Sequence, residues 1–221
     1  MGYELWLIIS QLAFRPMPQK PRQPKTSPRK LATQARAATT VEIILEAAAH
    51  ILERDGFEGY TTNAIAKRAG VSIGSVYQYF PNKDAITVAL IDRETAGLIA
   101  DIVDAAADPD WNSALAAMAR AGVTYQFKRP QLAQLLDLED NRLPNPNRQR
   151  LVEIVHAAIL SVLQRAQLAS HHAPDVVAFD VIALTRGIID AACARGEIDA
   201  DAIQHRVMQA VLGYLGAQEA S

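Results

Sequence analysis

The chain has few of the residues on which several common classes of protein depend. It contains one cysteine, Cys193, which excludes a disulfide scaffold and any zinc or iron–sulfur site built from several cysteines. Only 6% of its 221 residues are aromatic, whereas alanine, leucine and isoleucine are plentiful, and this favours helices over strands. Hydrophobic residues make up 50%, so a core can form and wholesale disorder is excluded. Nothing here points to an oxidising compartment, so we expect a cytoplasmic protein.

The chain also lacks an apolar run of the length that a membrane span requires. The apolar stretch Tyr3–Phe14 has 12 residues and contains Glu4, whereas a membrane-spanning helix needs about 20 residues. It does not look like a signal peptide, because no basic residue precedes it and Arg15 and Pro16 follow it. We therefore expect no membrane partner. Two interpretations of the stretch stay open: an upstream-extended start with Met17 as the initiator, or a short helix or disordered tail that begins at Met1.

Charge is divided unevenly along the chain. Residues 1–83 carry 11 Lys/Arg against 6 Asp/Glu (+5), and residues 84–221 carry 11 against 18 (−7), which sum to the net charge of −2. A basic front suggests that this part meets a polyanion. Residues 15–36 hold seven bases, no acid and five prolines, which prevent a regular helix over much of the segment. We predict that residues 1–36 form a flexible basic arm, which either is simply solvated or follows DNA phosphates or enters a minor groove.

The first predicted helix follows this arm. Thr39 and Glu42 have the spacing of a capping box, in which each side chain satisfies the other's backbone N–H. Apolar residues then recur at helical spacing until Gly56, a natural position for a helix end.

A helix-turn-helix is predicted immediately afterwards. Thr61 is a good N-cap for a helix over Thr62–Ala69, and Ser72 is a good N-cap for a helix over Ile73–Tyr79. Two short helices joined by the three-residue turn Gly70-Val71-Ser72 match the arrangement that binds DNA. The predicted DNA-binding domain covers residues 37–83.

The second of these helices has an unusual composition. Gly74 and Ser75 are small enough to let the helix sit close to a groove floor, and Tyr77 and Gln78 offer groups that can bind base edges or phosphates. Lys83 stands at the start of the next helix, where free backbone N–H groups also point, so it is a usable phosphate contact.

A longer pattern runs through the three helices and both turns: Ile44-Leu45-Glu46-Ala47-Ala48, Gly56-Phe57 and Thr61-Thr62-x-x-Ile65-Ala66-x-x-Ala69-Gly70-Val71-Ser72-x-Gly74-Ser75-Val76-Tyr77-x-Tyr79-Phe80-x-x-Lys83. With this pattern, residues 39–92 resemble the TetR family of transcriptional regulators. Beyond residue 92 the resemblance is one of length and helicity only.

The resemblance implies an all-α homodimer whose N-terminal domain binds a palindromic operator on double-stranded DNA. Its C-terminal domain would bind a small-molecule effector that relieves DNA binding. Transferred position by position, the residues facing the major groove would be Ser72, Gly74, Ser75, Tyr77 and Gln78. Those contacting the DNA backbone would be Thr61, Thr62, Tyr79 and Lys83. For Tyr77 and Tyr79, packing within the domain stays open as the alternative.

The rest of the chain, residues 84–221, is predicted to form a larger helical domain for ligand binding and dimerisation. No segment shows sustained strand alternation. The expected helices are residues 83–106, 111–128, 131–138, 147–169, a helix capped by Asp175 and ending near 195, and 200–216, with a loop over 141–146. The last two are apolar on more than one face, so a second subunit is expected to cover residues 175–217 in a homodimer. The alternative is a wholly intramolecular core.

Candidates for an effector site in this domain are residues that could line a space between helices, although residues of these types more often belong to the core. They are Met118, Arg120, Tyr125, Phe127, His156 and Phe179. No effector can be named from them.

We expect no enzyme activity, no catalytic residues, no cofactor and no metal, because nucleophile-elbow, Walker-loop and dinucleotide motifs are all missing. Glu153-x-x-His156 has the spacing of half a helical di-iron site, but no second such pair occurs. We therefore expect a ligand-responsive repressor. The alternatives are a helical metal-binding enzyme built around Glu153 and His156, and a constitutive DNA-binding protein without an effector.

Overall fold

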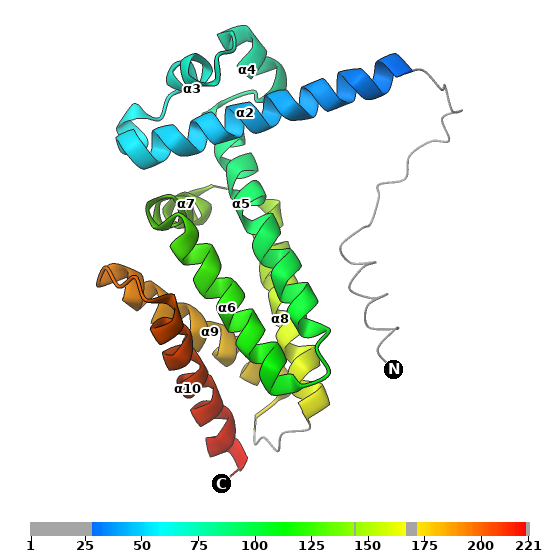
Figure 1. Ribbon diagram of the computed structural model, residues 1–221, viewed down its shortest axis with the longest axis vertical. Helices are drawn as coiled ribbons and strands as arrows, with labels where there is room; N and C mark the ends of the chain where they lie inside the picture. Colours follow the sequence, from blue (N-terminus) through cyan, green and yellow to red (C-terminus); the bar gives the residue numbers. More distant parts are fainter. Residues whose placement is uncertain (1–27, 144, 167–171, 220–221) are drawn as a thin grey trace. The chain divides into compact units, whose positions relative to one another are not determined.

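The computed structural model describes residues 28–143, 145–166 and 172–219, and within these ranges it contains helices and no strand. The all-α prediction is confirmed. Figure 1 labels the helices α2 (Pro28–Gly59), α3 (Thr62–Ala69), α4 (Ile73–Tyr79), α5 (Lys83–Ala106), α6 (Trp111–Lys128), α7 (Pro130–Arg142), α8 (Pro146–Ala166), α9 (Pro174–Ala194) and α10 (Ala200–Glu219). None of these helices combines the length and the apolar character that a membrane crossing demands. The apolar stretch Tyr3–Phe14 lies outside the described residues.

The described chain divides into two compact units. The first extends to Ile91 and also contains Leu135–Leu143, and the second contains Asp92–Gln134 and the residues after Leu143. The first unit is thus larger than the segment 37–83 to which the sequence pattern assigns DNA binding. It takes in the first part of α5 and most of α7.

The first unit is built on the packing of α2 against α3 and of α3 against α4. Its core holds Ile44, Leu52, Tyr60, Ile65 and Val76, each of them almost fully buried. Ile44 and Leu52 lie eight residues apart on one face of α2, Tyr60 lies between α2 and α3, and the two short helices contribute one residue each. The pattern of apolar residues is therefore enough to orient each helix toward the shared core.

One prediction about this unit is wrong. The sequence pattern placed the start of the first helix at Thr39 and an extended arm over residues 1–36, but α2 begins at Pro28. Proline is favoured at the first position of a helix, and residues 29–38 are rich in alanine, lysine and arginine, which are good helix formers. The Thr40 hydroxyl accordingly donates to the Arg36 carbonyl inside the helix, at 2.9 Å. The remainder of the arm, residues 1–27, lies outside the described residues.

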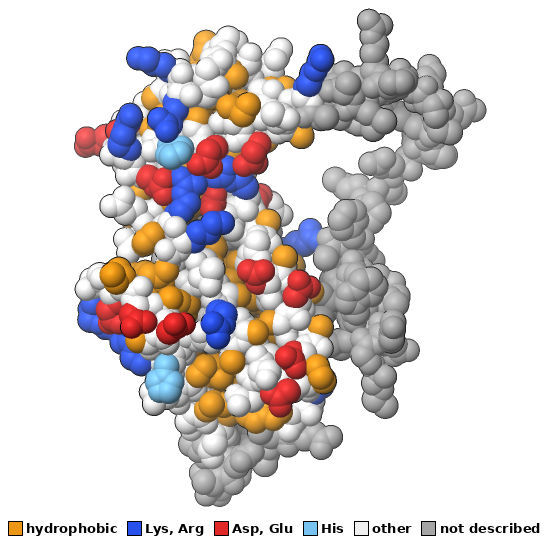
Figure 2. All heavy atoms as spheres, viewed as in Figure 1, with side chains coloured by type: hydrophobic (Ala, Val, Ile, Leu, Met, Phe, Trp, Pro, Cys, Tyr) orange, Lys and Arg blue, Asp and Glu red, His pale blue; other side chains and the backbone are white. Residues whose placement is uncertain are grey.

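The second unit is a helical bundle in which α6 packs against α8, α9 and α10 (Figure 1). Gly122 of α6 faces α9, since a methyl group at this position would lie 3.4 Å from Cδ1 of Ile189, in van der Waals contact. At the contact between α6 and α10, the Gln204 amide of α10 donates to the Ala116 carbonyl of α6 at 3.1 Å. Hydrophobic side chains also reach the surface of this unit, mixed with acidic ones, on the face that Figure 2 shows.

Several helix ends in the second half of the chain differ from the expectation. Helix α7 continues to Arg142 instead of ending at Leu138, so the predicted loop over 141–146 is shorter. Helix α9 starts with Pro174 at its first turn, and Asp175 lies inside the helix and does not cap it. Helix α10 is capped by Asp199, whose carboxylate accepts from the Ala202 N–H at 3.0 Å.

Candidate nucleic-acid interface

The helix-turn-helix forms through the local signals that predicted it. The Thr61 hydroxyl accepts from the Ala64 N–H at 3.2 Å and caps α3, and Gly70 ends that helix with φ of 68°, a left-handed conformation that favours glycine. The Ser72 hydroxyl then accepts from the Ser75 N–H at 3.0 Å and caps α4. Both predicted helix boundaries, both caps and the turn are confirmed.

Helix α4 is held by its inner face and exposes its outer face. Val76 is fully buried and Phe80 nearly so, and they seat the helix on the core of the first unit. The outer face is a contiguous strip of exposed residues spaced at i, i+1, i+4 and i+5, which we call the α4 strip: Ile73, Gly74, Tyr77 and Gln78. Tyr77 is 52% exposed and Ile73 38%, so the α4 strip alone presents two large apolar side chains to water.

The glycine in the α4 strip is not required by the fold of the unit. A methyl group added to Gly74 would find only the Ser72 hydroxyl, at 3.7 Å, which is an ordinary contact. Alanine would also stabilise the helix relative to glycine, by about 0.5–1 kcal/mol. The small size of residue 74 thus serves no contact within the described unit, as expected of a position that another molecule approaches closely.

Hydroxyl groups border the strip. The Ser72 and Ser75 hydroxyls lie 2.8 Å apart and hydrogen bond to each other. The Tyr77 hydroxyl lies 3.4 Å from Oγ1 of Thr62 in α3, so a polar contact links the two helices of the motif. Thr61 and Tyr79 are exposed as well, and Lys83 is half-buried.

The charge of this segment has one sign. Residues 60–83 contain Lys67, Arg68 and Lys83 and no aspartate or glutamate. Lys67 and Arg68 are exposed in the last turn of α3, where the helix dipole favours cations. Helix α4 itself carries no charged side chain.

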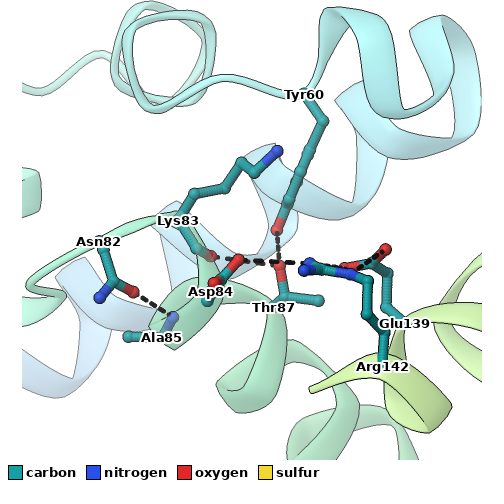
Figure 3. A network of polar contacts seen from close by, with 8 residues as sticks. All are labelled: Tyr60, Asn82, Lys83, Asp84, Ala85, Thr87, Glu139 and Arg142. Atoms are coloured by element: carbon teal, nitrogen blue, oxygen red, sulfur yellow. Dashed lines mark hydrogen bonds and ion pairs between the residues drawn. The ribbon is translucent and has the colours of Figure 1, made fainter.

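Behind the helix-turn-helix, a buried tyrosine ties α5 to the rest of the unit. Tyr60 is 1% exposed, and Figure 3 shows its hydroxyl directed at Thr87 of α5. Oγ1 of Thr87 lies 3.2 Å from the Tyr60 hydroxyl and 3.1 Å from the Lys83 carbonyl, so it can donate to either acceptor. The Lys83 ammonium lies 5.6 Å from the centre of the Tyr60 ring, within the range of a cation–π interaction.

The end of α7 joins the same network. Nη2 of Arg142 lies 3.4 Å from Oδ1 of Asp84, and Nε of Arg142 donates to the Glu139 carboxylate at 3.1 Å (Figure 3). These ion pairs connect the first turn of α5 with a segment more than 50 residues further along the chain. Neither Tyr60 nor Arg142 was among the predicted site residues, because no local pattern shows which distant residue a buried hydroxyl or a surface arginine will meet.

Raising the pH from 10 to 12 is expected to remove about 3 kcal/mol of folding stability through Tyr60. Burial raises the pKa of Tyr60 to about 12, and the negative charges of Glu139 and Asp84 act in the same direction. The unfolded chain releases this proton near pH 10, whereas the folded chain holds it to about pH 12. The contribution is therefore intact below pH 10 and is lost as pH rises toward 12. Urea unfolding at pH 9, 10, 11 and 12 measures it.

The matched control for that prediction is Tyr60→Phe, which keeps the ring and leaves Thr87 its bond to the Lys83 carbonyl. Every other ionisable group is the same in both proteins, so the difference between them isolates Tyr60. An equal loss of stability with pH in wild type and variant would show that the Tyr60 hydroxyl is not responsible.

The residues predicted to line an effector site are not all brought together. Met118 lies in the core of the second unit, and Phe127 packs against that core. Tyr125 and His156 are half-buried, whereas Phe179 is 51% exposed and Arg120 lies on the surface. Exposure on the outside of α6 makes Arg120 an unsuitable polar anchor for a buried ligand.

The residues of the metal-binding alternative have other contacts. Nε2 of Gln149 donates to Glu153 at 2.9 Å, and the His156 ring stacks on Phe179 with 4.2 Å between ring centres. Nε2 of His156 faces Asp175, 3.7 Å from its carboxylate. In the part of the chain that the structure describes, no three His, Cys, Asp or Glu side chains are grouped as a metal site would need.

Comparison with known proteins extends the resemblance beyond the helix-turn-helix. Residues 44–90 match the family model of bacterial regulatory proteins of the tetR family, and residues 110–215 match the model of the tetracyclin repressor-like C-terminal domain. The two matches together span more than half of the chain.

Individual relatives agree with these matches. The A-factor receptor protein of Streptomyces griseus is 38% identical over 66 residues, which are 30% of this chain and 24% of that protein. The transcriptional repressor DrrR1 of Streptomyces coeruleorubidus is 31% identical over 98 residues, 43% of this chain and 35% of that protein. The chain thus spans about a quarter to a third of the length of these two relatives.

Solved structures share the fold. The repressor SmeT of Stenotrophomonas maltophilia superimposes with a TM-score of 0.64 at 21% identity, over 79% of this chain and 89% of that one. The SmeT–triclosan complex gives a TM-score of 0.63 at 21% identity, over 80% and 91% of the two chains.

Proposed function

Because this chain belongs to the tetR family of bacterial regulatory proteins, we propose that it regulates transcription, and that it represses by binding an operator as a homodimer until a small molecule releases it. The observation that carries the DNA-binding part is the α4 strip. It combines an exposed helix face, a glycine that the fold does not need and a flanking segment with three bases and no acid.

In this proposal the exposed face of α4 enters the major groove. Polar groups of α3 and of the start of α5 contact the backbone on either side, which fixes the register of the helix. The groove-facing residues are Ser72, Gly74, Ser75, Tyr77 and Gln78, and the backbone contacts are Thr61, Thr62, Tyr79 and Lys83. Residues 1–27, which lie outside the described residues, contain four further bases, Arg15, Lys20, Arg22 and Lys25, and in this proposal these bases also contact the phosphates.

Binding of the full-length protein to a random duplex library, followed by anisotropy titration of the selected sequence, tests the proposal. We expect a palindromic site whose half-sites are centred about 34 Å apart, the repeat of one DNA turn. The absence of any selected sequence at low salt would refute it.

Lys83→Ala is expected to weaken operator binding and to flatten its salt dependence. Each phosphate contact contributes about −0.9 to the slope of log K against log salt concentration. Two Lys83 side chains in a dimer would therefore change the slope by about 2. Anisotropy titrations between 50 and 300 mM salt measure this slope. Lys128→Ala removes an exposed lysine from α6 of the second unit and should leave the slope unchanged; an equal slope for wild type and Lys83→Ala would exclude the phosphate contact.

The dimer is proposed to form through residues 175–217, as the sequence pattern indicated. Helix α9 exposes a row of apolar and small residues at helical spacing, Val176, Phe179, Ala183 and Gly187. Val176 and Phe179 are each about half exposed, at 48% and 51%. On α10, Gly213 and Gly216 are exposed one turn apart. Small residues permit close approach of helices, and exposed apolar side chains give the association its driving force.

The effector is proposed to bind in the second unit, near Met118, Tyr125, Phe127 and His156. Among the described residues of this unit, the buried polar side chains are Gln126 and Ser161, and neither is charged. An uncharged, largely apolar molecule would match such an interior. Its binding would shift α5 and so change the spacing of the two α4 helices.

Mass spectrometry of an organic extract of the purified protein, with return of the extracted compound to the operator complex, tests this step. A coupling free energy of about 1–3 kcal/mol between effector binding and operator binding predicts about 5–150-fold weaker operator binding when the effector is bound. If no extracted or added compound alters operator binding, the protein is a constitutive repressor.

A further inference from the structure

Helix α4 offers a reading surface without charge. Its sequence, Ile-Gly-Ser-Val-Tyr-Gln-Tyr, contains no Lys, Arg, Asp or Glu. The commonest specific contact in the major groove, an arginine or lysine bound to guanine O6 and N7, is therefore not available from this helix. The same is true of a carboxylate that accepts from cytosine N4.

The groups that remain on α4 match the two partners of an A·T pair. A glutamine amide can bind adenine N6 and N7 with two hydrogen bonds, and Gln78 is exposed on the α4 strip. The thymine methyl group is the one apolar feature of the major-groove edge and is contacted by apolar side chains. Ile73 is the aliphatic side chain of the strip and is 38% exposed.

Three hydroxyl groups at α4 are already engaged in hydrogen bonds or polar contacts within the unit. The Ser72 hydroxyl caps the helix and hydrogen bonds to that of Ser75, at 2.8 Å. The Tyr77 hydroxyl lies 3.4 Å from that of Thr62. Among the residues of the α4 strip, this leaves Ile73 and Gln78, at its two edges, as the side chains best placed to discriminate between bases. Gly74 lies between them and leaves room for the groove floor.

We propose that α4 selects A·T base pairs, with Ile73 contacting a thymine methyl group and Gln78 binding adenine. This rests on the proposed function, since it assumes that α4 enters the major groove of an operator. It adds Ile73 as a residue that determines specificity and names the base pairs that each half-site must present.

The contact is tested by removing the thymine methyl group alone. After library selection has given the operator, each thymine is replaced in turn by deoxyuridine, and affinities are measured for wild type and Ile73→Ala. Burial of one methyl group is worth about fourfold in affinity (~0.8 kcal/mol), so replacing the symmetric pair of thymines should weaken wild type about 15-fold. For Ile73→Ala the same replacement should have little effect.

Ile43→Ala is the matched control. Ile43 is an isoleucine of α2 in the same unit and is 45% exposed, but it is not on the α4 strip. Its replacement should leave the deoxyuridine effect at the wild-type size. A second variant, Gln78→Glu, should shift the preferred base at one position of each half-site from adenine to cytosine, because a carboxylate accepts from cytosine N4.

Three outcomes separate this inference from the proposed function. Selected half-sites with A·T pairs and a deoxyuridine effect that depends on Ile73 support both. A selected, tightly bound site in which no deoxyuridine replacement distinguishes wild type from Ile73→Ala, or in which the half-sites lack A·T pairs, overturns the inference and leaves the repressor intact. Failure to select any sequence overturns both.

Discussion

Replacing Gly74 with leucine is expected to make the protein more stable and at the same time unable to bind its operator selectively. In the folded unit, a Cβ atom at this position meets only the Ser72 hydroxyl, at 3.7 Å, and the side chain would extend outward from the α4 strip. Leucine also favours a helix over glycine by about 0.8–1 kcal/mol. The added bulk would stand between α4 and the groove floor, so the direct base contacts would be lost. We expect operator affinity to fall at least about 100-fold, toward non-specific binding.

Two measurements on the same sample check this prediction, urea unfolding and operator titration. Gly97→Leu is the control, because Gly97 is an exposed helical glycine of α5 with open space around its Cβ position. It should raise stability similarly and leave operator binding unchanged. If Gly74→Leu bound the operator as tightly as wild type, α4 would not lie in the groove.

Replacing Gly187 with arginine is expected to convert the dimer into folded monomers with little affinity for the operator. Nothing lies within 4 Å of a Cβ atom built at Gly187, so an arginine fits the single chain without a clash. In the proposed dimer the same position lies among Val176, Phe179 and Ala183 on the face that meets the second subunit. Burying a guanidinium group there without a partner is costly.

The effect on DNA binding follows from losing the second reading helix. Linking two binding modules raises affinity by about 10²–10⁴ over one module, so a monomer should lose binding by a factor in that range. Sedimentation velocity gives the oligomeric state, circular dichroism the helix content and anisotropy the operator affinity. Gly97→Arg, which introduces the same side chain on an exposed face of α5, should stay dimeric. A dimeric Gly187→Arg with normal operator binding would place the interface elsewhere.

The two substitutions use the same physical argument. Glycine is costly within a helix, and the structure shows whether the surrounding fold requires it. Gly59 is required, because a Cβ atom placed there would lie 2.3 Å from Cβ of Asp55. Gly74 and Gly187 are not, and both lie on surfaces to which a partner is assigned. We expect a substitution to change folding stability and partner binding in opposite directions only at such glycines, which the fold does not require and a partner approaches.

What the sequence could predict was largely local. The caps Thr61 and Ser72 and the turn at Gly70 each depend on residues three or four apart, and all of them form as expected. Because these signals are adjacent in the chain, the sequence alone predicts the helix-turn-helix and the face of α4 that points away from the core. The start of α2 was missed for a related reason: five prolines upstream suggested an extended arm, although helix formers follow the last of them.

The amino-acid sequence by itself determined that the protein is all-helical and that a short uncharged helix with a glycine and hydroxyl groups follows a tight turn. Only the tertiary structure decided that Tyr60 meets Thr87, that Arg142 reaches Asp84, and that Arg120 lies on the surface. The physical reason is the distance along the chain. A cap or a turn is specified by neighbouring residues, whereas the partner of a buried hydroxyl or of an arginine 58 residues away depends on how whole helices pack.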